Sequence, residues 1–126
     1  MTPSGVPHGV EFKRTMRLRT GREFAQIRND GRRLAKGCLI ANWLPQPEGA
    51  QARLGVITSR KLGKAIVRTR ARRLLREAFR LHQHDLRLSV HLVLIARSSI
   101  IGKKLADVER DLLLLLRQAN LLQKTN

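Results

Sequence analysis

The fold is decided by residues 52–96, which read ARLGVIT at 52–58, AIVRTRARRLLREAFRL at 65–81 and VHLVLIA at 90–96. In the middle segment, the apolar residues recur with the 3.6-residue period of an α-helix and fall within an arc of about 120°. They are Val67, Ala71, Leu74, Leu75, Ala78 and Leu81. The two flanking segments are short and apolar, and the second is continuous enough for a buried central strand. The sequence therefore predicts a strand, a helix and another strand.

Patterns on either side complete the predicted architecture. A short helix is expected at 21–29, where Thr20 and Glu23 form a capping-box pattern. Residues 33–44 are predicted to form one or two strands, and a last helix is expected at 103–119. The order is helix, two or three strands, helix, strand, helix. It is typical of the α+β class, in a two-layer sandwich with a small mixed sheet.

Length and composition fit one domain. The chain has 126 residues, of which 42% are hydrophobic, enough for one core. We predict that the domain spans 12–119 between two flexible tails, 1–11 and 120–126. The single cysteine, Cys38, excludes an internal disulfide and fits a cytoplasmic location. The sequence shows no apolar run of the roughly 18 residues that a membrane span needs, and no secretory signal.

The charge points to a polyanionic partner. Lys and Arg number 26 against 9 Asp and Glu, which gives a formal net charge of +17. Self-repulsion of this size opposes folding, so a partner of opposite charge is the usual reason to keep it. That partner is a nucleic acid, an anionic membrane or an acidic protein. Arginine predominates over lysine, and its planar guanidinium suits phosphates and stacks on bases, which favours nucleic acid.

The charge is concentrated on the predicted helix at 65–81 and the loop before it. Residues 60–80 contain nine cations and one acid, Glu77. Arg68, Arg72, Arg76 and Arg80 are each four residues apart and therefore form one stripe. A face that only contacts solvent usually mixes the two signs, so the stripe is predicted to bind a polyanion. Membrane binding would need bulky apolar residues beside the charges, and only Phe79 offers one.

A second basic cluster covers residues 13–36 and is interleaved with Phe12 and Phe24. Phe24 is most simply a core residue, with base stacking as the alternative. Trp43, near a strand end, either belongs to the core or presents its edge to RNA.

Several catalytic patterns are excluded. Gly63-Lys64 resembles part of a phosphate-binding loop, but Ala65 replaces the required Ser or Thr and Thr58 the first Gly. His82, His84 and Asp85 are close in sequence, yet no further Cys or His completes a metal site. No serine lies in a nucleophile-elbow context. We therefore predict no catalytic residue and no metal site in this chain.

Residues 60–77, RKLGKAIVRTRARRLLRE, closely resemble the signature of the bacterial ribonuclease P protein component. That signature runs Lys-Lys-x-Gly-x-Ala-Val-x-Arg-Asn-Arg-x-Lys-Arg-x-x-Arg-Glu. The flanking segments agree as well, among them Arg17-Leu18, Glu23-Phe24 and Leu92-Val93-Leu94-Ile95-Ala96-Arg97. The resemblance covers about residues 12–119.

The resemblance implies a fold and an activity. The fold would contain a left-handed βαβ crossover, an exception to the right-handed rule, and is also found in a domain of a small-subunit ribosomal protein. The chain would be the accessory protein subunit of a ribonucleoprotein endoribonuclease that removes the 5′ leader of precursor tRNA. The RNA subunit would perform the magnesium-dependent hydrolysis, so this chain alone would bind no cofactor. Its partners would be that RNA and the leader, with no obligate protein partner.

The resemblance also assigns site residues. The signature would contact the catalytic RNA through Arg60, Lys61, Lys64, Arg68, Thr69, Arg70, Arg72, Arg73 and Arg76. A cleft between the sheet and the first helix would hold the single-stranded leader, lined by Phe12, Arg14, Arg17, Phe24, Arg28 and Trp43. Thr69 replaces the asparagine of the family pattern. Arg28 and Asn42 stand where aromatic residues are frequent, which predicts weaker and more electrostatic stacking of the leader.

Three other functions fit the same composition. A structural ribosomal protein would carry similar charge without a link to tRNA processing. A self-sufficient nuclease would need carboxylates converging on metal ions, whereas the nine acids here are scattered along the sequence. A DNA-binding protein would be distinguished by a competition assay in which duplex DNA displaces the bound RNA.

Overall fold

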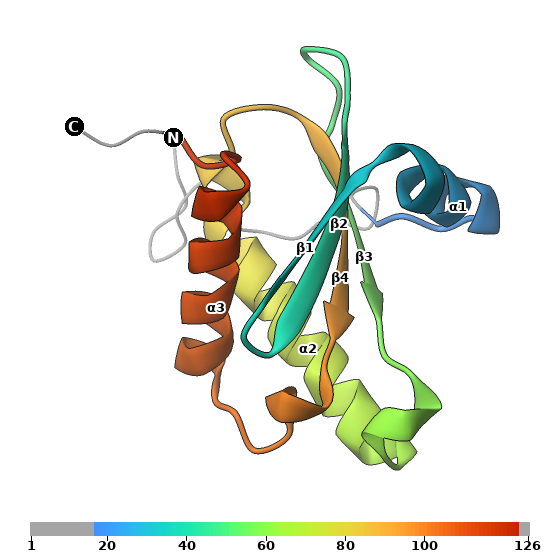
Figure 1. The fold of residues 1–126 in the computed structure, drawn as a ribbon, viewed down its shortest axis with the longest axis vertical. Coiled ribbons are helices and arrows are strands. Elements are labelled where there is room, and N and C mark those ends of the chain that lie inside the picture. Colours follow the sequence, from blue (N-terminus) through green and yellow to red (C-terminus); the bar gives the residue numbers. More distant parts are fainter. Residues whose placement is uncertain (1–16, 124–126) are drawn as a thin grey trace, which may run out of the picture.

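The computed structural model describes residues 17–123. A four-stranded sheet is covered on one face by α2 (Ala65–His82) and α3 (Leu105–Gln118). The shorter α1 (Gly21–Asp30) lies against the opposite face (Figure 1). Thr20 caps α1 because its side chain accepts a hydrogen bond from the Glu23 backbone, and the Glu23 side chain accepts one from Thr20 in return.

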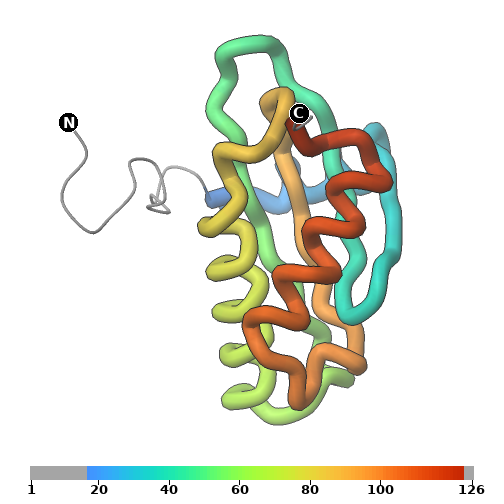
Figure 2. Tube along the Cα trace, turned by 90° about the vertical axis from the view of Figure 1, so that its left-hand side faces the viewer, coloured from blue at the N-terminus to red at the C-terminus, as the bar shows by residue number. Residues whose placement is uncertain are grey.

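The sheet has the order β1-β2-β4-β3. The strands are β1 (Arg32–Lys36), β2 (Leu39–Pro45), β3 (Arg53–Ile57) and β4 (Val90–Ala96). The β1–β2 and β2–β4 pairs are antiparallel, whereas β3 and β4 run parallel and are joined through α2. Figure 2 looks onto the helical layer, where β3 and β4 both run downwards behind α2 and β4 lies to the right of β3. This crossover is left-handed. The predicted order of elements is confirmed, with three strands between the first two helices.

The turn between β1 and β2 is held by α3. Gly37 adopts a φ of 57°, a left-handed conformation that favours glycine. The next residue, Cys38, donates its backbone N–H to Asp111 Oδ2 at 3.0 Å. A Cβ atom on Gly37 would collide with that carboxylate, so any larger residue at this position would also separate the hairpin from α3.

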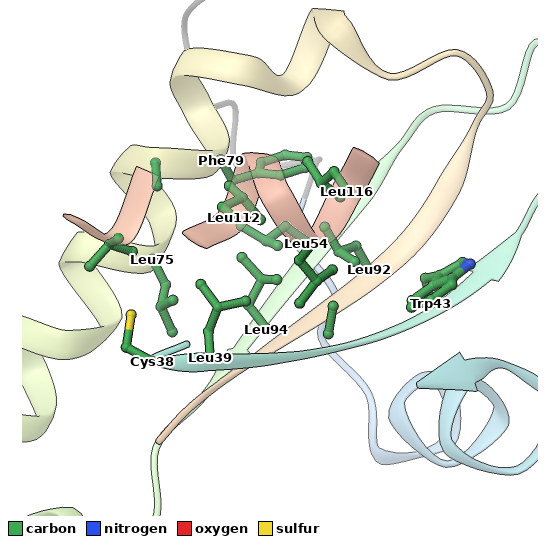
Figure 3. Close-up of a cluster of buried hydrophobic side chains, with 14 of the residues drawn as sticks. Cys38, Leu39, Trp43, Leu54, Leu75, Phe79, Leu92, Leu94, Leu112 and Leu116 are labelled. Atoms are coloured by element: carbon green, nitrogen blue, oxygen red, sulfur yellow. The ribbon is translucent and has the colours of Figure 1, made fainter. Parts of the chain in front are cut away.

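The main core lies between the sheet and the α2–α3 layer. Figure 3 shows side chains from all these elements meeting there, including Leu39, Leu75, Leu94 and Leu112. Burial of the Cys38 thiol, followed by the hydrogen bond and charge of Asp111, raises its pKa to about 12. Cys38 is therefore a neutral core residue at physiological pH.

The orientation of α2 differs from the predicted arc. Phe79 is 1% exposed, whereas Leu81 is 38% exposed. The helix is rotated about its axis relative to the prediction because it packs against both the sheet and α3, and a large ring fills the space between them. Phe79 is consequently unavailable as an apolar residue at a membrane surface. No helix within residues 17–123 is long and apolar enough to cross a membrane.

Trp43 must be reassigned from the leader cleft to the core. Its partner across the β2–β4 ladder is Leu92, and directly paired residues point to the same face of a sheet. Both side chains face α2 and α3, and Trp43 is only 5% exposed. Its ring therefore lies on the opposite face of the sheet from α1.

His82 connects the end of α2 to two acids. Its Nδ1 lies 2.9 Å from Asp85 Oδ2 in the 3₁₀ turn η3 (Gln83–Asp85), and its Nε2 lies 2.6 Å from Glu109 Oε2 in α3. Burial alone would lower the pKa of His82. The hydrogen bonds and charges of Asp85 and Glu109 outweigh burial and raise the pKa above its ordinary value of 6.5.

We expect replacement of His82 by Gln to destabilise the chain by about 1.5–3 kcal/mol at pH 6, the range for hydrogen bonds to charged groups. Because the folded-state pKa is raised, this contribution is complete below pH 6.5 and is lost as the pH rises through the folded-state value. Urea unfolding of both proteins between pH 5.5 and 9 measures the difference. A difference in unfolding free energy that did not shrink with rising pH would contradict the ion pairs of His82 with Asp85 and Glu109.

Candidate nucleic-acid interface

The arginine stripe on α2 lies along the border between the helix and β3. Arg68, Arg72 and Arg76 are all half-buried. Arg72 is held in place from two sides, since Nη1 donates to Thr58 Oγ1 at 2.6 Å and Nη2 donates to Thr69 Oγ1 at 3.2 Å. Thr69, which replaces the family's asparagine, thus acts as an acceptor that orients Arg72.

Among residues 17–123, no acid forms a salt bridge with Arg68, Arg72 or Arg76. The Nε–H of Arg68 is buried and donates to no acceptor among the described residues. Burial, followed by the positive charges of Arg17 and Arg72, lowers the pKa of Arg76. The positive charges of Arg17 and Arg72 therefore repel that of Arg76 at this border. A bound phosphate would relieve that repulsion, because guanidinium–phosphate hydrogen bonds are among the strongest in proteins.

The stripe ends at its fourth arginine. Arg80 Nε donates to Glu77 Oε1 at 2.9 Å, and a second hydrogen bond joins the same two side chains. The hydrogen bond and charge of Arg80 lower the pKa of Glu77. The only acid of the signature segment therefore neutralises Arg80 and leaves Arg68, Arg72 and Arg76 as the cationic part of the stripe.

The other predicted signature residues surround the first turns of α2. Arg60, Lys61 and Lys64 are exposed in the preceding loop, which includes the 3₁₀ turn η2 (Arg60–Leu62). Arg73 is exposed on the solvent side of the helix. Arg70 points away from the stripe and donates Nη2 to the carbonyl oxygen of Lys103 at 2.8 Å. The signature cations consequently occupy two sides of α2 and its N-terminal end.

A small pocket of about 110 Å³ lies at the junction of α1, β3 and α2. The lining residues are Arg17, Leu18, Phe24, Leu54, Gly55, Val56 and Arg76. The Leu18 backbone N–H donates to Leu54 O at 2.9 Å, which places Arg17 at the rim. Phe24 packs beside the small cluster formed by Leu18, Ile27 and Val93 and also lines the pocket, so both roles considered for it are structurally compatible.

The close approach of Phe24 depends on Gly55. A Cβ atom at that position would lie 2.5 Å from Phe24 Cε1, closer than van der Waals contact allows. Sequence analysis did not identify Gly55 as a site residue, since a glycine inside a strand only indicates that something approaches closely. The structure identifies the approaching group as the Phe24 ring.

The remaining predicted cleft residues have different outcomes. Arg28 is exposed in the last turn of α1. Phe12 and Arg14 lie outside the described residues. Asn42 stands at a position where the resembled pattern frequently has an aromatic residue. Its side chain is buried, and Nδ2 donates to Ile27 O at 3.2 Å and to Arg32 O at 2.7 Å. Asn42 thus fixes the end of α1 on the sheet instead of presenting a ring.

Glu23, which directly precedes Phe24 in α1, is already engaged in hydrogen bonds. It accepts hydrogen bonds from the Arg19 and Thr20 backbones and lies 3.3 Å from Arg53 Nη1. The Arg19 and Thr20 backbone hydrogen bonds lower the pKa of Glu23, with a smaller effect from Arg53. Within residues 17–123, no three His, Cys, Asp or Glu side chains converge in a way that could hold a metal ion.

Comparison with known proteins identifies this arrangement. The family model described as Ribonuclease P matches residues 12–120. A ribonuclease P protein component from Symbiobacterium thermophilum is 35% identical over 113 residues, covering 90% of this chain and 98% of that protein. Another, from Desulfovibrio desulfuricans, is 38% identical over 109 residues and covers 83% of each chain.

Solved structures agree with the sequence relatives. The ribonuclease P protein of Staphylococcus aureus superposes with a TM-score of 0.77 at 25% identity, covering 86% of this chain and 98% of that one. The ribonuclease P protein of Thermotoga maritima gives a TM-score of 0.70 at 31% identity, covering 80% and 96% respectively. Sequence and fold thus lead to the same family.

Proposed function

The chain belongs to the bacterial ribonuclease P protein family and is a component of that ribonucleoprotein endoribonuclease; from this premise we propose how it acts. The α2 signature binds the catalytic RNA in the cytoplasm, while the cleft between α1 and the sheet binds the 5′ leader of precursor tRNA. The chain thereby promotes magnesium-dependent removal of the leader and formation of the mature tRNA 5′ end.

One observation carries this proposal. Arg76 belongs both to the α2 stripe and to the pocket that contains Phe24 and Arg17. The two predicted RNA sites therefore form one continuous cationic surface, which a single RNA assembly can cover. Backbone contacts and aromatic stacking both tolerate different sequences, as a factor that serves many precursor tRNAs requires.

The chemistry is proposed to reside in the RNA subunit, which would use the magnesium ions. Four acids of this chain have structural roles that account for their positions. Glu23 caps α1, Glu77 pairs with Arg80, Asp107 accepts the Lys104 backbone N–H and Asp111 accepts that of Cys38. The protein contributes positive potential, which strengthens the binding of a polyanionic substrate.

The direct test is cleavage of a precursor tRNA by a bacterial ribonuclease P RNA at low, near-physiological magnesium, with and without the chain. We expect accurate 5′ maturation only when RNA and protein are both present, and no cleavage by the protein alone. If the chain bound both RNAs but left cleavage unchanged, a general RNA-binding role of the ribosomal type would replace this proposal.

Replacement of Gly55 by Ala tests the leader cleft. The new Cβ must displace the Phe24 ring from the pocket, and loss of a stacked base costs about 1–3 kcal/mol. We expect a 5- to 150-fold weaker affinity of the RNA–protein complex for precursor tRNA, with little change for mature tRNA, which lacks the leader.

Gly21→Ala is the matched control, because no atom lies within 4 Å of a Cβ placed there. It should bind precursor tRNA as the unmodified chain does. Phe24→Ala should reproduce the Gly55→Ala defect if the displaced ring is its cause. Equal losses for precursor and mature tRNA in the Gly55→Ala complex would count against leader binding in this cleft.

A further inference from the structure

The connection between β4 and α3 is attached to the signature helix by a residue of the signature itself. Arg70 Nη2 donates to Lys103 O at 2.8 Å. The connection has a defined shape, since Gly102 has a φ of 82° and the Lys103 N–H donates to Ile100 O at 3.0 Å. Figures 1 and 2 both show the N-terminal ends of α2 and α3 at the same end of the molecule.

This connection adds positive charge beside the signature. Residues 97–106 contain three cations, Arg97, Lys103 and Lys104, and no acid. Lys104 is exposed and Lys103 half-buried. The next acid along the chain, Asp107, accepts the Lys104 backbone N–H at 3.0 Å, and this hydrogen bond is the main cause that lowers its pKa. Asp107 is therefore engaged in capping α3.

A groove of about 230 Å³ separates the connection from α2. Its lining is largely apolar and includes Val67, Ile100 and Ile101, with Arg70 at its rim. Ile101 is 54% exposed, and Ile66, one helical turn before Arg70, is 78% exposed. Large apolar side chains in water beside a cationic rim mark an interaction surface. The apolar parts suit ribose faces and the cationic rim suits phosphates.

We infer that Gly102–Lys104 forms a second arm of the RNA-binding surface, which contacts the backbone of the catalytic RNA beside the segment bound by α2. In this arrangement Lys103 and Lys104 are binding residues. Arg70 is a positioning residue that acts by holding the arm, whereas the family signature alone assigned it to direct RNA contact. The inference rests on the proposed function and extends it to residues outside the signature.

The double variant Lys103→Gln with Lys104→Gln tests the arm in binding of the chain to the ribonuclease P RNA at several salt concentrations. Each lost phosphate contact lowers the log–log salt slope by about 0.7–0.9. We therefore expect a slope reduced by about 1.4–1.8 and an affinity about 25- to 60-fold weaker at 0.1 M salt. A slope equal to that of the unmodified chain would overturn the inference.

The matched control removes the same charge from the exposed face of α3. Arg110 and Arg117 are both exposed, and Arg110 lies 3.8 Å from Asp107 and from Asp111. The Arg110→Gln, Arg117→Gln variant should keep the unmodified salt slope. A slope reduced as much as in the lysine variant would show a nonspecific effect of net charge and overturn the inference.

A double-mutant cycle separates positioning by Arg70 from direct contact. Arg70→Met should weaken RNA binding in the unmodified chain but add little in the Lys103→Gln, Lys104→Gln background, because coupled residues are non-additive. Fully additive losses would mean that Arg70 itself contacts RNA. If the unmodified chain failed to promote cleavage while the lysine variant still flattened the salt slope, the proposed function would fail and the arm would stand.

Discussion

Simultaneous replacement of Arg68 and Arg72 by Ala is expected to weaken binding to the ribonuclease P RNA by about 25- to 60-fold at 0.1 M salt, with a salt slope reduced by about 1.4–1.8. Arg68 contributes because its buried Nε lacks an acceptor among the described residues, which an RNA oxygen would supply. Arg72 contributes because its neighbours orient it at the same border. Filter binding or fluorescence titration across a salt series measures both quantities.

A second variant separates the charge of Arg72 from its orientation. Thr58→Val removes the hydroxyl that accepts from Arg72 Nη1 and keeps both guanidinium groups. It should lower the affinity by less than the double alanine variant and leave the salt slope nearly unchanged. An unaltered slope in the Arg68→Ala, Arg72→Ala protein would show that the RNA binds elsewhere.

Replacement of Phe79 by Ala is expected to destabilise the chain by about 3–5 kcal/mol, the range for a buried aromatic residue. Phe79 is 1% exposed and fills the space between α2, α3 and the sheet. In a domain of this size, the loss corresponds to a fall in Tm of about 10–20 °C. Thermal and urea unfolding followed by circular dichroism measure it.

Leu81→Ala is the informative control, because the helical period of the sequence placed Leu81 on the buried face and left Phe79 outside it. At 38% exposure, Leu81 should contribute less than about 1 kcal/mol. Equal destabilisation by the two substitutions would contradict the observed rotation of α2.

These two residues show what the sequence could and could not predict. The order and approximate ends of the elements followed from local patterns, and β4 at Val90–Ala96 matches its predicted range. The rotation of α2 depends on its packing against both the sheet and α3, and the apolar period of one helix carries no information about those neighbours. The residues alone left Trp43 open between the core and the leader cleft for a related reason, since the face that a strand residue occupies is set by the pairing of β2 with β4.

The candidate site was predictable to a similar extent. The stripe of Arg68, Arg72 and Arg76 followed from four-residue spacing. Two residues that orient individual cations by hydrogen bonds lie in other segments of the chain, so the spacing within α2 could not predict them. Thr58 orients Arg72, and Lys103 receives Arg70. The close contact of Gly55 with Phe24 joins β3 to α1, so it appears only once the chain is folded.

The position of β1 at one edge of the sheet has a consequence for solubility. An edge strand presents unpaired backbone groups that can recruit a strand from another molecule, and charged side chains discourage this. Arg32, Arg33 and Lys36 in β1 are all exposed. The other edge, β3, is partly covered by the bridge between Arg17 and Leu54. Part of the positive charge thus protects the chain against aggregation: neutralising β1 would favour edge-to-edge association between copies.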